Sequence, residues 1–290
     1  MPELPEVETI VRGLNKKVSG KKIINIWTDW PRHFSRHKGG FVSFRRQVSG
    51  ATIQSVKRIG KNIIFELLDG KLMLIHLKMT GKLLLISRHR KSDGLAMSKK
   101  RSPYIHAIFY LSGNKLLAFL DVRKFGKILA ASAPRLRKSA GPTKSKILGL
   151  DVGPDALLIK LVDFQKSLAG RKICIKKALL DQKILAGIGN IYADEILFLS
   201  RLHPLRSAKS LKKNEIKILH DSIKIILRKA IKLRGSSMSD YADVTGKPGN
   251  YYVLRLVYGR EGEPCPRCET KIVRATLHGR PFHFCPKCQK

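Results

Sequence analysis

Apolar residues near the start of the chain recur at the spacing of a helix. Four of them fall at positions i, i+3, i+4 and i+7: Val7, Ile10, Val11 and Leu14. This stripe predicts a helix over about residues 5–15, and Pro5 suits its first turn because proline has no amide N–H to leave unpaired there. Pro2 and Glu3 then precede the helix N-terminus, where the helix dipole favours an anion such as a phosphate.

Between residues 22 and 131 the pattern changes to short β-rich runs, separated by Gly, Asp and Asn. The clearest runs cover residues 23–27, 62–67, 72–77, 105–111 and 115–120. Several short strands at this spacing predict a β-sandwich or a β-barrel.

After residue 150 the apolar spacing becomes helical again, and it predicts helices over residues 157–169, 175–180, 191–199 and 211–233. The turn Gly187-Ile188-Gly189-Asn190 lies between two of them, and we expect it to present backbone N–H groups to a phosphate. Such turns are common between helices, so the turn alone identifies no function. The whole pattern predicts about two domains, followed by a short cysteine-rich segment over residues 257–290.

The charge balance indicates the class of partner. Lysine and arginine number 58 against 21 aspartate and glutamate, which gives a net charge of +37 and an isoelectric point near 10.4. This excess repels itself unless an anionic partner is present, and nucleic acid is the obvious polyanion. Ribosomal proteins and proteins that bind acidic membranes share the balance, so charge alone names no activity. The sequence has no run of 18 apolar residues and no signal peptide, and we expect a soluble intracellular protein.

Two stretches interrupt the pattern with basic residues. The composition of residues 88–101 predicts a long loop, and that of residues 135–146 predicts an interdomain linker. A solvated flexible segment is the plainer interpretation of each, and nonspecific attraction for phosphates is the alternative.

The strongest spacing is a pair of Cys-x2-Cys knuckles separated by sixteen residues: Cys265, Cys268, Cys285 and Cys288. Four thiolates in this arrangement suit a closed tetrahedral zinc site, with an iron–sulfur cluster or disulfides as the alternatives. Zinc binding would fold a segment too small to have its own core. Residues 276–282 between the knuckles predict the tip of a hairpin. Cys174 is left over, and its apolar surroundings predict a core residue.

The first two residues suggest a catalytic amine. Methionine aminopeptidases usually remove Met1 when a residue as small as Pro2 follows. The mature chain would then begin with a secondary amine of pKa about 8, which can attack an electrophilic carbon and form an iminium. Glu3 is placed to move the proton that the attack requires. The alternative is that Pro5 and the neighbouring acids only begin a helix.

Five segments together carry a family resemblance: PELPEVET at the N-terminus, HLKMTG, DVRKFG, GIGNIYADE and the four C-terminal cysteines. Over essentially its whole length, the chain resembles the bacterial formamidopyrimidine-DNA glycosylases. Endonuclease VIII-type relatives typically begin PEGPEI, which this chain does not. The resemblance implies an α+β fold with four parts: an N-terminal β-sandwich with its leading helix over residues 1–134, a linker over 135–150, a helix-two-turn-helix domain over 151–256 and a zinc-binding β-hairpin over 257–290.

The resemblance also implies catalytic roles. Pro2 would attack the deoxyribose C1′ of a damaged nucleotide, Glu3 would act as the acid/base group, and Glu6 would orient this corner. Lys61 would assist β-elimination and contact a phosphate at the lesion, and Arg280 would assist δ-elimination. Without the resemblance, surface cations would be the simpler interpretation of Lys61 and Arg280.

The remaining implied roles concern DNA. Base chemistry in a duplex requires an everted nucleotide, and Met79, Arg123 and Phe125 match the residues that fill the void. Strand core positions are the alternative for Met79 and Phe125. From the helical domain, the resemblance implies phosphate contacts by Arg171, Lys172 and Asn190. Outside that domain, Tyr104 is a further predicted DNA-binding residue.

Three positions depart from the family pattern. Lys124 follows Arg123 where the family often has a second arginine, which removes a bidentate fork. A histidine that contacts DNA in relatives aligns near Tyr104, two positions before His106. Ser239 stands where the lesion-capping loop often has a lysine. These departures leave the predicted nucleophile untouched.

The sequence thus predicts a bifunctional glycosylase and lyase that acts on oxidised purines in duplex DNA, with one structural Zn2+ as its only cofactor. We expect a monomer in the bacterial cytoplasm, associated with the nucleoid and not with a membrane. A glycosylase of the same plan for oxidised pyrimidines and a non-catalytic zinc-ribbon DNA-binding protein are the alternatives.

Overall fold

The computed structural model describes residues 1–87, 102–132, 148–237 and 241–290. Both basic stretches and Ser239 therefore lie outside the described residues. The chain divides into two compact units: unit 1 has residues 1–2, 6–151 and 236–249, and unit 2 has residues 3–5, 152–235 and 250–290. The domain boundaries predicted from the sequence stay predictions.

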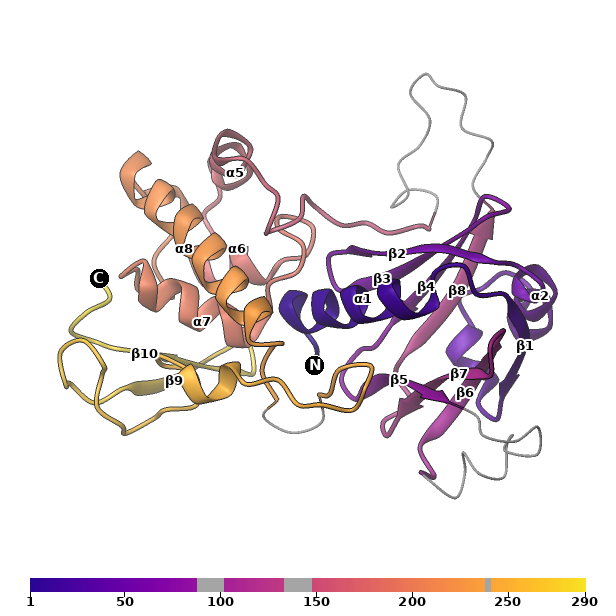
Figure 1. Ribbon diagram of the computed structural model, residues 1–290. Coiled ribbons are helices and arrows are strands. Elements are labelled where there is room, and N and C mark those ends of the chain that lie inside the picture. Colours follow the sequence, from indigo (N-terminus) through magenta and orange to yellow (C-terminus); the bar gives the residue numbers. More distant parts are fainter. Residues whose placement is uncertain (88–101, 133–147, 238–240) are drawn as a thin grey trace. The chain divides into compact units, whose positions relative to one another are not determined.

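Unit 1 is built on two antiparallel four-stranded sheets (Figure 1). One sheet has the order β1-β6-β7-β5, with β1 Ile23–Thr28, β6 Ile105–Leu111, β7 Lys115–Asp121 and β5 Gly81–Ser87. The other has the order β2-β3-β4-β8, with β2 Ile53–Ile59, β3 Asn62–Leu67, β4 Lys71–His76 and β8 Lys127–Ser132. The predicted β-sandwich is confirmed.

The alternation of side chains along β3 shows how the sheets pack. Ile63, Phe65 and Leu67 point into the main core, which also contains inward residues of the other sheet, such as Phe109 and Phe119. Complete burial of each such side chain contributes about 1.5–3 kcal/mol to stability.

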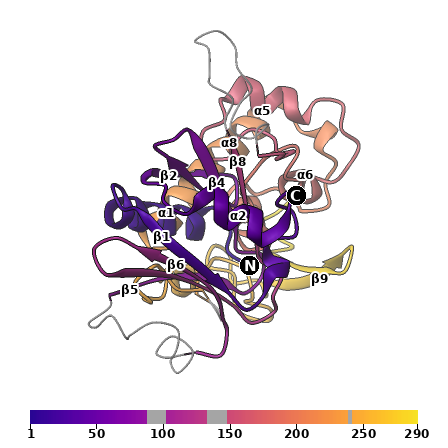
Figure 2. The same cartoon turned by 90° about the vertical axis from the view of Figure 1, so that its right-hand side faces the viewer.

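Helix α1, Leu4–Val18, follows the predicted stripe and extends it by one turn. Its apolar face lies in the core of unit 1 from Val7 to Val18. The sequence did not predict α2, Gly40–Val48, or the 3-10 helix η1, Pro31–Phe34. Helix α2 is short and follows Gly39 in a left-handed conformation, a start that carries no capping side chain. Both views place α2 beside β1 (Figures 1 and 2).

Unit 2 contains four α-helices: α5 Leu161–Leu168, α6 Ile175–Leu180, α7 Asn190–Leu199 and α8 Lys213–Lys232. Two 3-10 helices, η2 Ala208–Ser210 and η3 Tyr251–Leu254, complete it. The central helix α7 is buried on nearly all sides and packs against α8, α6 and the C-terminal hairpin. All four predicted helices are present, although α5 begins four residues later than predicted.

The late start of α5 has a local cause. Asp155 accepts the N–H of Leu157 with its side chain, at 3.0 Å, and that of Ile159 with its carbonyl, at 2.9 Å. These bonds form a separate turn. Lys224 of α8 donates to the carbonyl oxygens of Ala156 and Ile159 and fixes the turn in place.

The C-terminal segment forms the predicted hairpin, with β9 Val273–Leu277 and β10 Arg280–Phe284. His278 and Gly279 connect the strands with φ values of 46° and 73°, which are typical of a type I′ turn. Cys174 is half-buried and precedes α6 at its N-cap, so its prediction as a core residue is wrong. Within the described ranges, none of the helices combines the length and apolarity needed to cross a membrane.

Candidate functional site

The carboxylate of Glu3 lies at the N-terminus of α7 in unit 2. It accepts hydrogen bonds from the backbone N–H of Gly189 at 2.7 Å, of Ile191 at 3.0 Å and of Tyr192 at 3.4 Å. Of these three residues only Gly189 belongs to the turn over residues 187–190, so the prediction that the turn presents its N–H groups to a phosphate is wrong for Gly189. A β-carbon at Gly189 would lie 2.3 Å from the Glu3 carboxyl carbon, so only glycine allows this approach.

Pro2 and Glu6, the other two residues with predicted roles near the N-terminus, belong to unit 1. Pro2 is buried, and its nitrogen is in an amide bond with Met1, which is 47% exposed. Glu6 is buried and accepts the N–H of Ser236 at 2.8 Å, while the Tyr241 hydroxyl donates to the Glu6 carbonyl at 3.4 Å. Glu6 therefore holds the beginning of the segment over residues 236–249. The catalytic roles of Pro2, Glu3 and Glu6 stay predictions.

Lys61 lies at the turn between β2 and β3 and is only 7% exposed. His76 at the end of β4 is its close electrostatic neighbour. Burial lowers the pKa of His76 to about 3, and the charges of Lys78 and Lys61 add to the effect. His76 was not among the predicted site residues, although it begins the HLKMTG segment.

Met79, Arg123 and Phe125, here called the wedge residues, are all exposed, with 43% for Met79 and 51% for Phe125. A core role for Met79 and Phe125 is excluded by this exposure. The Arg123 guanidinium lies 4.7 Å from the centre of the Phe125 ring. An exposed apolar pair beside a guanidinium can enter a base stack and hydrogen-bond an unpaired base.

A buried carboxylate joins the two segments that carry the wedge residues. Asp121 accepts the hydroxyl of Thr80 at 2.6 Å with one oxygen and the N–H of Gly126 at 2.6 Å with the other. The Thr80 hydroxyl in turn accepts the N–H of Arg123 at 3.0 Å. His33 lies behind this loop with its Nδ1 2.9 Å from the Gly126 carbonyl oxygen. The wedge residues are thus fixed by a network that sequence reasoning did not identify.

Two of the three departures from the family pattern, at Tyr104 and Lys124, lie among the described residues. Tyr104 is 46% exposed, and its carbonyl accepts the N–H of Asp121 at 2.9 Å, so it adjoins the wedge segment. His106 is buried, with Nδ1 2.8 Å from Asp29, and faces away from solvent. Lys124 has a φ of 57° and lies over the Trp30 ring at 4.1 Å, a cation–π contact.

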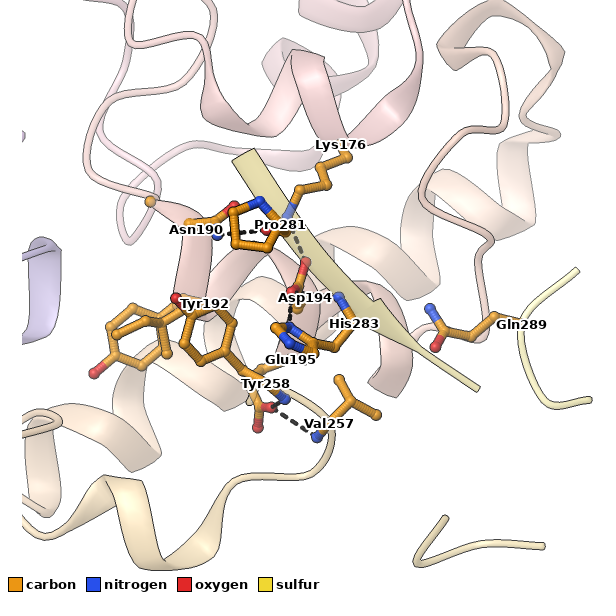
Figure 3. A network of polar contacts seen from close by, with 12 residues as sticks. Lys176, Asn190, Tyr192, Asp194, Glu195, Val257, Tyr258, Pro281, His283 and Gln289 are labelled. Atoms are coloured by element: carbon orange, nitrogen blue, oxygen red, sulfur yellow. Dashed lines mark hydrogen bonds and ion pairs between the residues drawn. The ribbon is translucent and has the colours of Figure 1, made fainter. Parts of the chain in front are cut away.

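In unit 2, Asn190 and Arg280 come together. Asn190 donates from Nδ2 to the carbonyl oxygen of Pro281 at 2.8 Å, which places it one residue from Arg280 (Figure 3). Arg280 is exposed and lines a pocket of about 350 Å³ with Lys177 of α6 and His278 of the hairpin turn. Glu3, Asn190 and Arg280 are therefore neighbours at one end of α7.

Arg171 and Lys172 lie in the loop between α5 and α6. Both are exposed. Arg171 donates from Nε to the Ser167 carbonyl at 2.7 Å and so satisfies the last turn of α5. Their phosphate contacts, like those of Asn190, stay predictions.

Two adjacent acids of α7, Asp194 and Glu195, bind the C-terminal segment to this helix (Figure 3). Asp194 forms a fully buried ion pair with Lys176 and accepts the N–H of His283 at 2.8 Å. Glu195 accepts the N–H groups of three consecutive residues, Leu256, Val257 and Tyr258, at 2.8–2.9 Å. Because Asn190 and Asp194 are four residues apart, one face of α7 binds strand β10 twice.

The four sulfur atoms of Cys265, Cys268, Cys285 and Cys288 lie within 4.8 Å of one another. The Sγ atom of Cys288 lies 3.9 Å from that of Cys265 and 3.3 Å from that of Cys268, and the Sγ atoms of Cys268 and Cys285 are 3.5 Å apart. A tetrahedral zinc ion with bonds of about 2.3 Å requires sulfurs about 3.8 Å apart, so the residues fit the metal. The N–H of Arg267 points at the Cys265 sulfur and that of Cys288 at the Cys285 sulfur, each at 3.4 Å. Such bonds orient thiolates toward a metal.

Comparison with known proteins covers the whole chain. Residues 1–128 match the formamidopyrimidine-DNA glycosylase N-terminal domain, residues 151–242 match the H2TH domain of the same proteins, and residues 262–290 match the zinc finger found in FPG and IleRS. The formamidopyrimidine-DNA glycosylase of Enterococcus faecalis is 37% identical over 290 residues, which are 100% of this chain and 98% of the relative. The chain belongs to the formamidopyrimidine-DNA glycosylase family. The Heliobacterium modesticaldum member is 38% identical, with 100% of both chains covered.

Solved structures of the family agree with this fold. A Lactococcus lactis FPG mutant bound to DNA that contains Fapy-dG is similar with a TM-score of 0.85 and 36% identity over 100% of both chains. The L. lactis FPG complex with abasic-site DNA gives the same TM-score and identity over 99% of each chain. With the zinc-finger match, the four cysteines constitute one structural zinc site, and the predicted cofactor is confirmed.

Proposed function

We propose that this protein is a bifunctional DNA glycosylase and abasic-site lyase of base excision repair. It excises oxidised purines, namely 8-oxoguanine and formamidopyrimidines, from duplex DNA and then cleaves the strand. The observation that carries the proposal is the full-length likeness to L. lactis FPG in complex with Fapy-dG DNA. Because the proposed substrate is chromosomal DNA, we expect the protein to act at the bacterial nucleoid.

The first step uses the N-terminal amine after removal of Met1. The Pro2 nitrogen attacks the deoxyribose C1′, and the bond from C1′ to the base breaks, so the base leaves with the electron pair and takes up a proton. Opening of the sugar ring then gives an iminium between Pro2 and C1′. Glu3 moves the proton to the ring oxygen, and its carboxylate is oriented for this by the N–H groups of Gly189 and Ile191.

The iminium makes strand cleavage possible. It acidifies the C2′ proton, whose loss expels the 3′-phosphate, and a second elimination expels the 5′-phosphate. Lys61 assists the first elimination and contacts a phosphate at the lesion, and Arg280 holds the phosphate of the second. The product is a one-nucleotide gap. Zinc has a structural role in the hairpin that carries Arg280. Because four thiolates fill its coordination sphere, the ion has no open position for a substrate.

The wedge residues make the damaged nucleotide accessible. Met79 and Phe125 fill the space that the everted nucleotide leaves, and Arg123 hydrogen-bonds the unpaired cytosine. Their exposure and their attachment through Thr80 and Asp121 support this role.

Trapping of the covalent intermediate tests the mechanism. The chain is produced with a short cleavable N-terminal extension, and two forms are compared: one with the extension intact and one with Pro2 freed by a protease. Each is incubated with an 8-oxoguanine:C duplex and borohydride, which reduces an iminium to a stable amine. We expect a DNA adduct only from the form with free Pro2. An adduct of equal yield from the extended form would assign the nucleophile to another residue.

A comparison of lesions tests the substrate class. Single-turnover excision is measured on 8-oxoguanine:C and on thymine-glycol:A duplexes of the same sequence. We expect faster excision of 8-oxoguanine. The reverse order would favour a glycosylase for oxidised pyrimidines, and binding without excision of either would favour a non-catalytic DNA-binding protein.

A further inference from the structure

Cationic side chains gather at one end of the β2-β3-β4-β8 sheet in unit 1. His76 of β4 and Lys127 of β8 are direct cross-strand partners at this end. Lys61 immediately precedes β3, which pairs with β4 through Ile63 and Ile75. Lys78 follows β4, and its backbone N–H donates to Nδ1 of His76 at 2.9 Å.

Two lysines of this cluster, Lys78 and Lys127, carry their charge without an acidic partner among the described residues. Burial lowers the pKa of Lys127, and the charges of Arg36 and Lys78 lower it further. The charges of Arg36 and Lys78 therefore repel that of Lys127. This repulsion raises the free energy of the folded protein, and an anion bound at this end of the sheet would lower it.

The protonation of His76 adds a donor to the cluster. Its pKa of about 3 makes the ring neutral at physiological pH. Because Nδ1 accepts a hydrogen bond from Lys78, the proton of the neutral ring is on Nε2, which is then a donor. The cluster thus offers hydrogen-bond donors and positive charge together, as a phosphate requires.

The cluster also lies next to the wedge residues. Lys78 directly precedes Met79, and Lys127 is two residues after Phe125. Two trans peptide units span at most about 7 Å, so both lysines begin at the base of the wedge segments. A duplex that receives Met79 and Phe125 into its base stack has its backbone close to this position.

We propose that Lys78 and Lys127 form a phosphate subsite of their own, which binds a backbone phosphodiester of the DNA beside the lesion. This subsite is distinct from the contact assigned to Lys61, and it rests on the proposed function. Lys127 is the residue that distinguishes this subsite. It is the cross-strand partner of His76, and it therefore adds a second lysine side chain beside Lys78.

The salt dependence of binding tests the subsite. Affinity for a duplex with a tetrahydrofuran abasic analogue is measured from 50 to 300 mM KCl for the wild type, Lys127→Gln, Lys78→Gln and the control Lys71→Gln. Lys71 lies at the opposite end of β4 and forms an ion pair with Asp69. We expect each of the first two variants to lower the slope of log affinity against log salt by about one, and Lys71→Gln to leave it unchanged. An unchanged slope for Lys127→Gln would overturn the proposal.

Replacement of single phosphates by uncharged analogues identifies the phosphate that Lys127 contacts. Single phosphates around the analogue are replaced in turn by methylphosphonates. We expect one replacement to weaken the binding of DNA by the wild type and by Lys71→Gln. The same replacement should leave binding by Lys127→Gln unchanged, because that variant has already lost the ammonium that pairs with this phosphate. If every replacement weakens both lysine variants equally, Lys127 contacts no phosphate, and the proposal fails.

Activity separates this proposal from the one on which it rests. If the wild type neither binds nor cleaves lesion DNA, the proposed function fails. If it does both while Lys127→Gln behaves as Lys71→Gln, only the subsite fails. Thermal unfolding of the free variants is the folding control, and removal of one cation from the cluster should leave the melting temperature unchanged or raise it.

Discussion

Thr80 shows how one hydroxyl can position a whole functional segment. It donates to Asp121 and accepts from the N–H of Arg123, so it links the segment of Met79 to that of Phe125. The network is local in space but spans 41 residues along the chain. Sequence motifs indicated the wedge residues themselves, whereas the side chains that hold them are visible only when the two segments are placed together.

Substitution Thr80→Val keeps the shape of the side chain and removes both bonds. A buried carboxylate oxygen and a backbone N–H then lose their partner, and we expect the free energy of unfolding to fall by about 1–3 kcal/mol. We also expect slower excision of 8-oxoguanine, because the wedge residues are less well fixed. Urea unfolding and single-turnover kinetics measure the two effects. Thr80→Ser, which retains the hydroxyl, is the control and should be close to the wild type in excision; a rate as low as that of the valine variant would argue against the network.

His76 predicts a dependence of stability on pH. Its pKa is about 3 in the folded protein and about 6.5 in the unfolded chain, so the unfolded chain takes up the proton first as the pH falls. The stability that neutral His76 contributes is therefore complete above pH 6.5 and declines between about pH 6.5 and 3.

Substitution His76→Asn tests this dependence, because the asparagine oxygen can still accept the N–H of Lys78. We expect denaturant midpoints measured at pH 7, 5.5 and 4.5 to decline less in the variant than in the wild type. Parallel declines in the two proteins would show that carboxylates and other histidines account for the acid sensitivity.

At the scale of elements, α7 is the centre of unit 2. Glu3 caps its first turn, and Asn190 and Asp194, one turn apart, bind β10. Glu195 holds the chain that leads to the zinc site. The position of Arg280 is therefore determined by a helix some ninety residues earlier in the sequence. The zinc ion folds the hairpin, and α7 orients it.

Removal of one partner of a buried ion pair is costly, and Asp194 offers a clear case. In Asp194→Asn the ammonium of Lys176 stays buried without a countercharge, and we expect a loss of about 3–5 kcal/mol in the free energy of unfolding. The double variant Lys176→Met/Asp194→Asn removes the charge as well and should recover part of the loss. Chemical denaturation of the three proteins measures this. A double variant less stable than Asp194→Asn would contradict the argument.

Long elements with regular periodicity could be predicted from the sequence, and short or irregular ones could not. The apolar stripe of α1 and the β-rich run of β3 gave correct elements because their burial follows one period. Residues 157–159 continue the helical spacing of α5, yet Asp155 closes a separate turn there, and this competition was not visible in the pattern. Helix α2 was missed because its nine residues begin at a pair of glycines.

The site was only partly predictable for a related reason. The cysteine spacing and the motifs indicated which residues carry chemistry, because those signals are local. The contact of Glu3 with Gly189 joins residues 186 positions apart, and no spacing rule predicts it. The same contact excludes the N–H of Gly189 from the phosphate binding that the turn predicted.

For the whole molecule, the net charge of +37 is the dominant electrostatic fact. Repulsion between the positive charges destabilises the folded state. Added salt screens this repulsion, with a screening length of about 10 Å at 0.1 M. We therefore expect the melting temperature of the free protein to rise between 10 and 200 mM NaCl. Differential scanning calorimetry measures this, with a short DNA duplex as a second addition that should stabilise further. A melting temperature that falls with salt would indicate that ion pairs outweigh the repulsion.

The cap that Glu3 places on α7 also sets an order of events during synthesis. The N-terminus leaves the ribosome first, but its binding partner is not made until about 190 residues have been translated, on the order of 10–40 s later at bacterial rates. Until then Glu3 has no N–H groups of α7 to bind, and the predicted removal of Met1 can take place before this contact forms. If Met1 is removed as predicted, the removal can therefore precede the burial of Glu3, because the contact joins residues 186 positions apart.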